Sequence, residues 1–186
     1  MRRGFKTESK RLALEVRAEI GLGAHEPFDP YHLADEYGVR VVQLTDLDAT
    51  DAVQYFTEIR STALSGALIP NGSGLLILEN DSHTPQRRRS TLSHEMAHVL
   101  LEHPFGVTLA HDRKCGLGGD NEKEADLLAG ELLIPFDAAR RQAWKDATDE
   151  EVADLFEVST QHAAWRMNAS GARKIVQRTR AARGWN

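Results

Sequence analysis

The chain has 186 residues, which is enough for one sizeable hydrophobic core but too few for several large domains. Hydrophobic residues make up 41% of it and charged residues 27%, and no apolar run approaches the roughly 18 residues that a membrane span needs. The net charge of −5 argues against a protein that coats nucleic acid or anionic membrane with its whole surface. The sequence therefore predicts a cytoplasmic globular protein that does not cross a membrane.

The first predicted elements are two helices. Apolar residues recur at helical spacing over residues 7–20, and glycines follow directly. In the next segment, Asp29 can cap a short helix, Pro30 fits its first turn and Gly38 ends it. Neither segment carries a pattern of catalytic residues, so both are interpreted as structural.

A strand and a hairpin are predicted next. Residues 39–44 read VRVVQL, which is typical of a buried strand. The runs ALSGALIP and LLILEN flank Asn71-Gly72, a pair that can supply the positive backbone angles of a hairpin turn. Either strand of this hairpin can bind an extended substrate through its backbone, or it can simply pack beneath a helix.

The stretch HEMAH at residues 94–98 is the strongest chemical signal in the sequence. In a helix, His94 and His98 project from one face about 40° apart, so two neutral imidazoles can bind one metal ion. Glu95 projects about 100° away from His94, where it can act as a general base toward water. Because the pattern can also arise by chance, a third ligand has to be identified.

A second predicted helix, NEKEADLLAGELLIP, offers that ligand. On a helical wheel, Glu122 and Asp126 border the apolar face, whereas Glu124 and Glu131 point to solvent. We therefore predict that Glu122 binds the metal and that Asp126 accepts the free ring N–H of a metal-bound histidine, with Glu124 as the alternative ligand. This donor set favours a single Zn²⁺ ion, with Mn²⁺ as the alternative.

Three further residues near these helices were considered. His103 and His111 are candidates for stabilising an oxyanion, although the preferred interpretation of each is an ordinary loop or surface histidine. Cys115, the single cysteine, lies in the glycine-rich stretch KCGLGGD, and no internal disulfide is possible. It is interpreted as an incidental loop thiol, with a redox or metal-contacting role as the alternative.

The C-terminal part predicts a small helical subdomain. Thr148 and Glu151 form a capping box, and a short break near Ser159 separates two helices that resemble a helix-turn-helix. Gln161 and Arg166 are the candidates for DNA contacts, but we expect no direct DNA binding because the second helix carries little basic charge. A basic tail without acidic residues follows, with Arg173, Lys174, Arg178, Arg180 and Arg183.

The order of these elements predicts an α+β fold with a small mixed sheet, zincin-like active-site helices and a C-terminal helical subdomain. We expect two domains. The first, residues 1–145, is a zincin-like metallopeptidase domain. The second, residues 146–186, is the small helix-turn-helix-like subdomain with its basic tail.

HEMAHVLLEHP and NEKEADLLAGELLIP resemble the ImmA/IrrE metallopeptidases. Members pair HExxH, followed by V-L-L and a further histidine, with a helix of the form E-x-E-A-N-x-F-A-x-x-L-L-x-P. The resemblance extends to the GFK-containing first helix, to DPYHLADEYGVRVVQL and to LFEVSTQHAAWRM. Asp126 replaces the usual asparagine and Leu128 a common phenylalanine, but neither change removes a proposed ligand or the base.

The resemblance implies a site-specific zinc endopeptidase. Its expected substrate is a helix-turn-helix transcriptional repressor, whose cleavage relieves repression of mobile-element or stress-response genes. The alternative is a regulatory module that does not cleave, and that binds a repressor or DNA through its C-terminal helices. An intact Glu95 favours the enzyme, because a purely structural metal site has no use for a base at that position.

Overall fold

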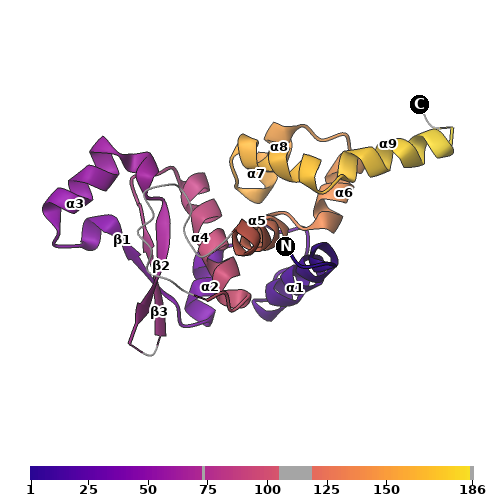
Figure 1. Ribbon diagram of the computed structural model, residues 1–186. Coiled ribbons are helices and arrows are strands. Elements are labelled where there is room, and N and C mark those ends of the chain that lie inside the picture. Colours follow the sequence, from indigo (N-terminus) through magenta and orange to yellow (C-terminus); the bar gives the residue numbers. More distant parts are fainter. Residues whose placement is uncertain (73, 105–118, 185–186) are drawn as a thin grey trace. The chain divides into compact units, whose positions relative to one another are not determined.

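A computed structural model describes residues 1–72, 74–104 and 119–184 (Figure 1). The fold is α+β with a small mixed sheet, as predicted. The chain forms two compact units, of which the first comprises Met1–Phe5 and Asp29–Ala129, and the second Lys6–Phe28 and Gly130–Asn186. Each unit is therefore built from two separate stretches of chain, and the domain boundary between residues 145 and 146 stays a prediction.

The sheet lies in the first unit and has the strand order β1-β3-β2. Strand β1 (Arg40–Gln43) runs parallel to β3 (Gly74–Glu79), and β2 (Gly66–Asn71) runs antiparallel to β3. The predicted hairpin is confirmed, with the positive φ of 62° at Gly72, whereas Asn71 remains within β2. Among the strands that the structure describes, β3 is central and β2 lies at one edge of the sheet.

Two helices of the first unit lie beside the sheet. Helix α2 (Pro30–Glu36) begins as predicted, because the Asp29 side chain accepts a hydrogen bond from the backbone N–H of Tyr31 at 2.9 Å. Helix α4 (Pro85–Leu100) packs against α2, β2 and β3 (Figure 1). Leu92 and Met96 are fully buried, so α4 packs its apolar side into the core, away from the two histidines of HEMAH.

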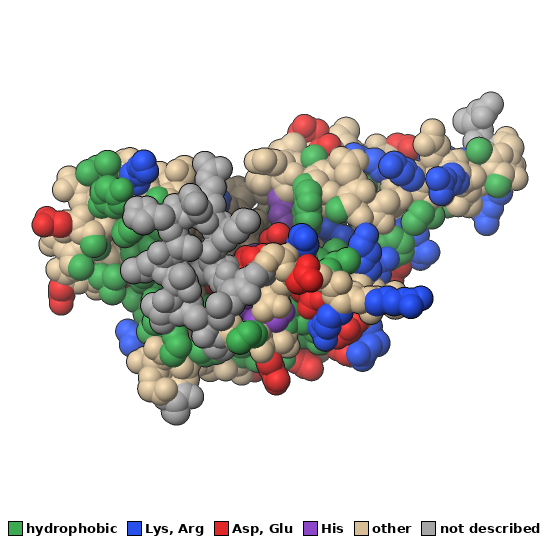
Figure 2. All heavy atoms as spheres, in the orientation of Figure 1, with side chains coloured by type: hydrophobic (Ala, Val, Ile, Leu, Met, Phe, Trp, Pro, Cys, Tyr) green, Lys and Arg blue, Asp and Glu red, His purple; other side chains and the backbone are tan. Residues whose placement is uncertain are grey.

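The segment between β1 and β2 contains helical turns that the sequence did not predict. These are η1 (Leu44–Asp46), α3 (Thr50–Gln54), the π-helical turn η2 (Tyr55–Ile59) and η3 (Ser61–Ala63). They are short and largely exposed, so they lack the apolar stripe by which a helix is recognised in a sequence. Hydrophobic side chains, including Tyr55 and Ile59, are exposed over this segment (Figure 2).

Helix α5 (Gly119–Leu133) corrects one prediction. The wheel placed Glu124 and Glu131 in solvent, but their exposed fractions are 4% and 2%, whereas the Asp126 side chain is 61% exposed. Each buried glutamate meets an arginine from elsewhere in the chain: Glu124 pairs with Arg2, and Glu131 with Arg166. A helical wheel represents one helix alone, so it could not show that Glu124 and Glu131 have arginine partners elsewhere in the chain.

The second unit consists of helices. These are most of α1 (Phe5–Glu19), the end of α5, α6 (Phe136–Trp144), α7 (Asp149–Phe156), α8 (Thr160–Ala169) and α9 (Ala172–Ala182). The predicted capping box of Thr148 and Glu151 is present at the start of α7. Helix α6 was not predicted, because a proline directly after a helix commonly ends it, whereas Pro135 also stands at the N-cap of α6.

The predicted basic tail is a helix instead. In α9, Ala172 and Val176 lie one turn apart and are buried, so this segment packs rather than remaining solvated. Basic side chains gather along α9 (Figure 2), but two of them form ion pairs, Arg173 with Asp149 and Arg180 with Asp146. Within the described residues, no helix is long and apolar enough to span a bilayer.

Candidate metal centre

Helices α4 and α5 bring three of the predicted residues together. His94 and His98 lie one turn apart on α4, with their Nε2 atoms 3.1 Å from each other. From α5, Oε2 of Glu122 lies 3.3 Å from Nε2 of His94, and its Oε1 lies 3.5 Å from Nε2 of His98. One ligand atom from each residue falls within 4.8 Å of the other two, so the three can hold one metal ion.

The chemistry of this cluster fits a cation. Two neutral imidazole nitrogens and a carboxylate oxygen are all electron-pair donors, and they repel one another at these distances unless a positive charge lies among them. Although burial lowers the pKa of His94, hydrogen bonds to Asp126 and Glu122 raise that pKa to about 10. Burial and the positive charge of His94 lower the pKa of His98. The carboxylates of Asp126 and Glu122 therefore favour one positive charge in this cluster, and a second charge, on His98, is disfavoured.

The outer nitrogen of each histidine also has a partner. Nδ1 of His94 lies 3.0 Å from Oδ1 of Asp126, and Nδ1 of His98 lies 2.9 Å from Nδ1 of His103. These contacts orient both rings so that Nε2 faces the cluster. Asp126 thus lies where the sequence placed it, beside the free nitrogen of a candidate ligand, while its role stays a prediction.

The other residues singled out from the sequence lie elsewhere. Glu124, the alternative ligand, lies outside the cluster, and its carboxylate contacts Arg2. His103, a candidate for stabilising an oxyanion, contacts the outer nitrogen of His98. His111 and Cys115 are outside the described residues.

Glu95 is buried where α4 meets β2. Only 4% of it is exposed, and its carboxylate accepts a hydrogen bond from the backbone N–H of Leu68. Burial raises the pKa of Glu95, and the positive charge of His94 opposes that shift. A carboxylate with a raised pKa, next in sequence to a candidate ligand, has the properties of a general base.

Strand β2 approaches α4 closely because of Gly66. A Cβ atom at this position would lie 2.6 Å from Cγ2 of Thr91 and 3.7 Å from Cγ of Glu95. Any larger residue would therefore push the strand away from the helix that carries the candidate base. Glycine here serves close approach rather than an unusual backbone angle.

The free edge of β2 runs past this point. Ser65 C=O accepts from the N–H of Asn80 at 2.9 Å, so in the antiparallel register Ser65 and alternate residues after it face β3. The backbones of Gly66, Leu68 and Pro70 consequently face away from β3. In the described part of the chain, no other strand pairs with this edge.

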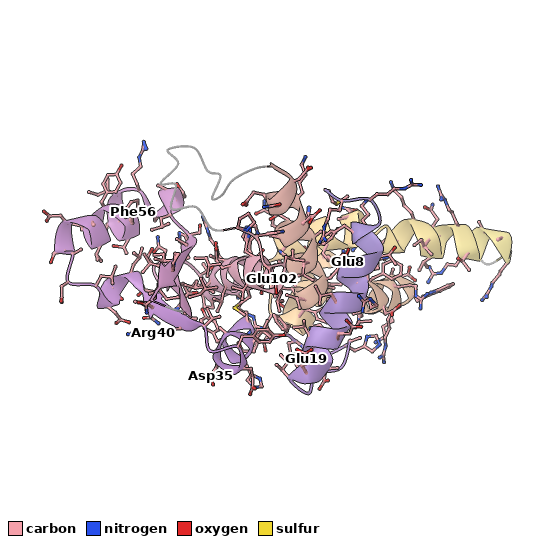
Figure 3. The ribbon with its side chains drawn as sticks, turned by 60° about the horizontal axis from the view of Figure 1, so that its bottom comes forward. Glu8, Glu19, Asp35, Arg40, Phe56 and Glu102 are labelled. Atoms are coloured by element: carbon pink, nitrogen blue, oxygen red, sulfur yellow. The ribbon has the colours of Figure 1, made fainter. Side chains whose placement is uncertain are left out.

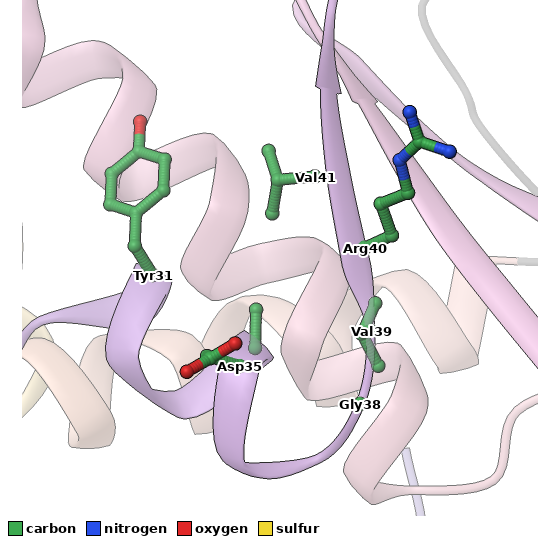
Figure 4. A pocket seen from close by; sticks show the side chains of 7 residues that line it. Tyr31, Asp35, Gly38, Val39, Arg40 and Val41 are labelled. Carbon is green, nitrogen blue, oxygen red and sulfur yellow. The ribbon is translucent and has the colours of Figure 1, made fainter.

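A surface hollow of the first unit lies away from the cluster. It has a volume of about 410 Å³ and lies between α2 and β1, where it is lined by Tyr31, Asp35, Arg40 and their neighbours (Figure 4). The Tyr31 hydroxyl is already used, since it donates to Glu79 at 2.6 Å. The residues that line this hollow include none of the candidate metal ligands.

A family model described as the IrrE N-terminal-like domain, a peptidase model, matches residues 34–168, well over half of the chain. The chain belongs to the ImmA/IrrE family of peptidases. The match contains all three residues of the cluster and Glu95, and the family together with the cluster supports a metal ion at this site. Among curated proteins, no match to the sequence was found.

Sequence reasoning missed the contributions of β2 and of the N-terminal segment. Leu68 and Gly66 look like ordinary strand residues. Because successive residues of a strand face opposite sides, the sequence of the hairpin could have indicated that the backbones of Leu68 and Pro70 face the same edge. The pairing of Arg2 with Glu124 spans 122 residues of sequence and left no local signal.

Proposed function

We propose that the protein is a zinc-dependent endopeptidase. The observation that carries the proposal is the convergence of His94, His98 and Glu122 in a member of a peptidase family, with the buried carboxylate of Glu95 directly after the first histidine. His94, His98 and Glu122 would hold the ion. A bound zinc ion supplies a Lewis acid that polarises the scissile carbonyl and makes water more acidic.

The chain's own residues carry the proton. Glu95 takes a proton from water as the water oxygen forms a bond to the carbonyl carbon. The same carboxyl group then gives that proton to the departing amine as the C–N bond breaks. The raised pKa of Glu95 suits its roles as a base toward water and as an acid toward the amine. A carboxylate with an ordinary, lower pKa would be a weaker base and would hold the proton less well between the two steps.

The free edge of β2 is the proposed binding surface for the substrate. An extended peptide can pair there with the backbone groups of Gly66 and with the C=O of Leu68, because the N–H of Leu68 already bonds to the candidate base Glu95. Strand β3 is unsuitable for this role, because both of its edges are already paired. Of the two hairpin strands, the proposal therefore selects β2.

The proposed substrate is a helix-turn-helix transcriptional repressor, as the family resemblance implies. Direct DNA binding by this chain receives no support from Arg166, because that side chain is 1% exposed and paired with Glu131. Two of the basic residues on α9 are likewise paired within the same unit. The C-terminal helices are therefore proposed to act structurally or to contact the repressor.

The test compares wild type, Glu95→Gln and the control Glu58→Gln, which makes the same change at an exposed residue of the first unit. Metal content is measured in each purified protein, and cleavage of candidate helix-turn-helix repressors from the same organism is followed by mass spectrometry. We expect Glu95→Gln to keep its zinc and to cut about 10²- to 10⁴-fold more slowly, with Glu58→Gln unchanged. Wild type that binds zinc but cuts neither these repressors nor a mixture of extended peptides would refute the proposal.

A further inference from the structure

The end of helix α4 places His103 against His98. Glu102 has a positive φ of 49°, and the N–H groups of Glu102 and His103 bond back to the carbonyls of Val99 and His98 at 3.0 and 3.1 Å. This pattern is a Schellman motif, formed here with glutamate in the left-handed position that glycine usually occupies (Glu102 is labelled in Figure 3). The turn brings the two imidazole rings to a centroid distance of 4.9 Å.

The contact between the rings restricts where their protons lie. The two Nδ1 atoms are 2.9 Å apart, so one must donate and the other accept. If Nε2 of His98 binds the ion, Nδ1 of His98 carries the proton and donates it. Nδ1 of His103 then accepts, and the remaining proton of His103 lies on Nε2.

That second nitrogen faces a buried carboxylate. Nε2 of His103 lies 3.9 Å from Oε2 of Glu124, and the two side chains are 8% and 5% exposed. Glu124 is held in turn by Arg2, whose Nε donates to Oε2 at 3.1 Å and whose backbone N–H donates to Oε1 at 2.6 Å. The negative charge of Glu124 favours the proton on the near nitrogen of His103.

We propose that His103 is a positioning residue for His98 and that Glu124, fixed by Arg2, sets the tautomer of His103. The two candidate histidine ligands are then oriented in different ways. His94 has a carboxylate, Asp126, directly on its outer nitrogen, whereas His98 reaches the carboxylate of Glu124 through a second imidazole. This role explains why a glutamate is buried on α5 outside the metal cluster, and it rests on the proposed metal site.

The first test is the protonation pattern of the zinc-loaded wild type, which requires no substitution. Long-range ¹H–¹⁵N correlation spectra distinguish protonated from unprotonated ring nitrogens. We expect the proton of His98 on Nδ1 and that of His103 on Nε2. A proton on Nδ1 of His103 would overturn the proposal, because that nitrogen could not then accept from His98.

The second test measures zinc affinity by competition with a chelator. His103→Leu removes the acceptor, while His103→Asn keeps an oxygen close to the position of Nδ1, and His32→Leu is the control at a half-exposed histidine of α2. We expect His103→Leu to bind zinc about 10- to 100-fold more weakly, with a changed visible spectrum after Co²⁺ substitution. His103→Asn is expected to restore most of the affinity and the spectrum, and His32→Leu to match wild type.

The outcomes separate this proposal from the one before it. Wild type that binds no metal would refute both the zinc site and the role of His103. Wild type that binds zinc, together with His103→Leu of unchanged affinity and Co²⁺ spectrum, would refute the role of His103 alone.

Discussion

Both units of the protein bury charged or strongly polar side chains, and the two units differ in how some of these side chains are arranged. In the second unit, Arg17 donates to the carbonyls of Gly23 and Leu132, and Arg166 pairs with Glu131 and donates to Ile134. The first unit pairs Glu79 with Arg88 and Glu124 with Arg2 in the same way, but it also holds the cluster, in which potential metal-binding atoms converge on one point. A buried charged side chain that has a partner of opposite charge within the protein indicates a structural role. Several lone-pair donors that converge on one point indicate a site for a bound cation.

The largest effect is expected from breaking the buried pair of the second unit. Glu131→Gln leaves the guanidinium of Arg166 buried without a counter-charge, which should lower the free energy of unfolding by about 3–5 kcal/mol. Urea denaturation measures this, with Glu150→Gln as the exposed control on α7. The zinc affinity of the folded protein should not change; a weaker zinc affinity would show that the two units are not distinct in function.

The next largest effect concerns the cluster itself. Glu122→Gln removes the anionic ligand, and we expect the zinc affinity to fall by more than about 100-fold. Loss of a residue that only hydrogen-bonds to a ligand typically lowers metal affinity by about 10- to 100-fold. In the presence of EDTA, the free energy of unfolding of Glu122→Gln should differ from that of wild type far less than the free energy of unfolding of Glu131→Gln does. If Glu122→Gln retains full zinc affinity while Glu124→Gln loses zinc altogether, the ligand is Glu124 and the assignment is wrong.

A smaller effect on zinc affinity is expected at Asp126, which contacts the outer nitrogen of His94. Asp126→Asn keeps an oxygen near Nδ1 of His94 but removes the charge, so zinc affinity should fall by about tenfold. Isothermal titration of the metal into each variant measures the difference, and Asp35→Asn on α2 is the control. Unchanged affinity would mean that this exposed carboxylate orients nothing.

The smallest effect is expected at an exposed pair of the second unit. Arg11 and Glu15 lie one turn apart on α1 with side chains 67% and 49% exposed. Glu15→Gln should lower the free energy of unfolding by about 0.3–0.5 kcal/mol, and less at high salt. If Glu15→Gln lowered the free energy of unfolding as much as Glu131→Gln, burial would not explain the difference between the two ion pairs.

The parts of the site that repeat with helical period were predictable from the sequence. The spacing of His94 and His98 fixed their common face, and the apolar pattern of α5 placed Glu122 and Asp126 beside them. The burial of Glu124 was not predictable, because it depends on Arg2, 122 residues away. Helix α9 was missed for another reason: its charges dominate its composition, while only Ala172 and Val176 mark its buried face.

Strand β2 has a consequence for which proteins can be cut. Its outward backbone groups can pair only with an extended chain, and Pro70 contributes no N–H to that pairing. The proposed substrate, a helix-turn-helix repressor, has its own backbone groups bonded within helices, so under this proposal the segment to be cut has to open before it can bind. The proposal therefore predicts that the rate of cleavage depends on how often the repressor unfolds locally, and that a substitution which loosens the repressor at that segment accelerates its cleavage without any change in the peptidase.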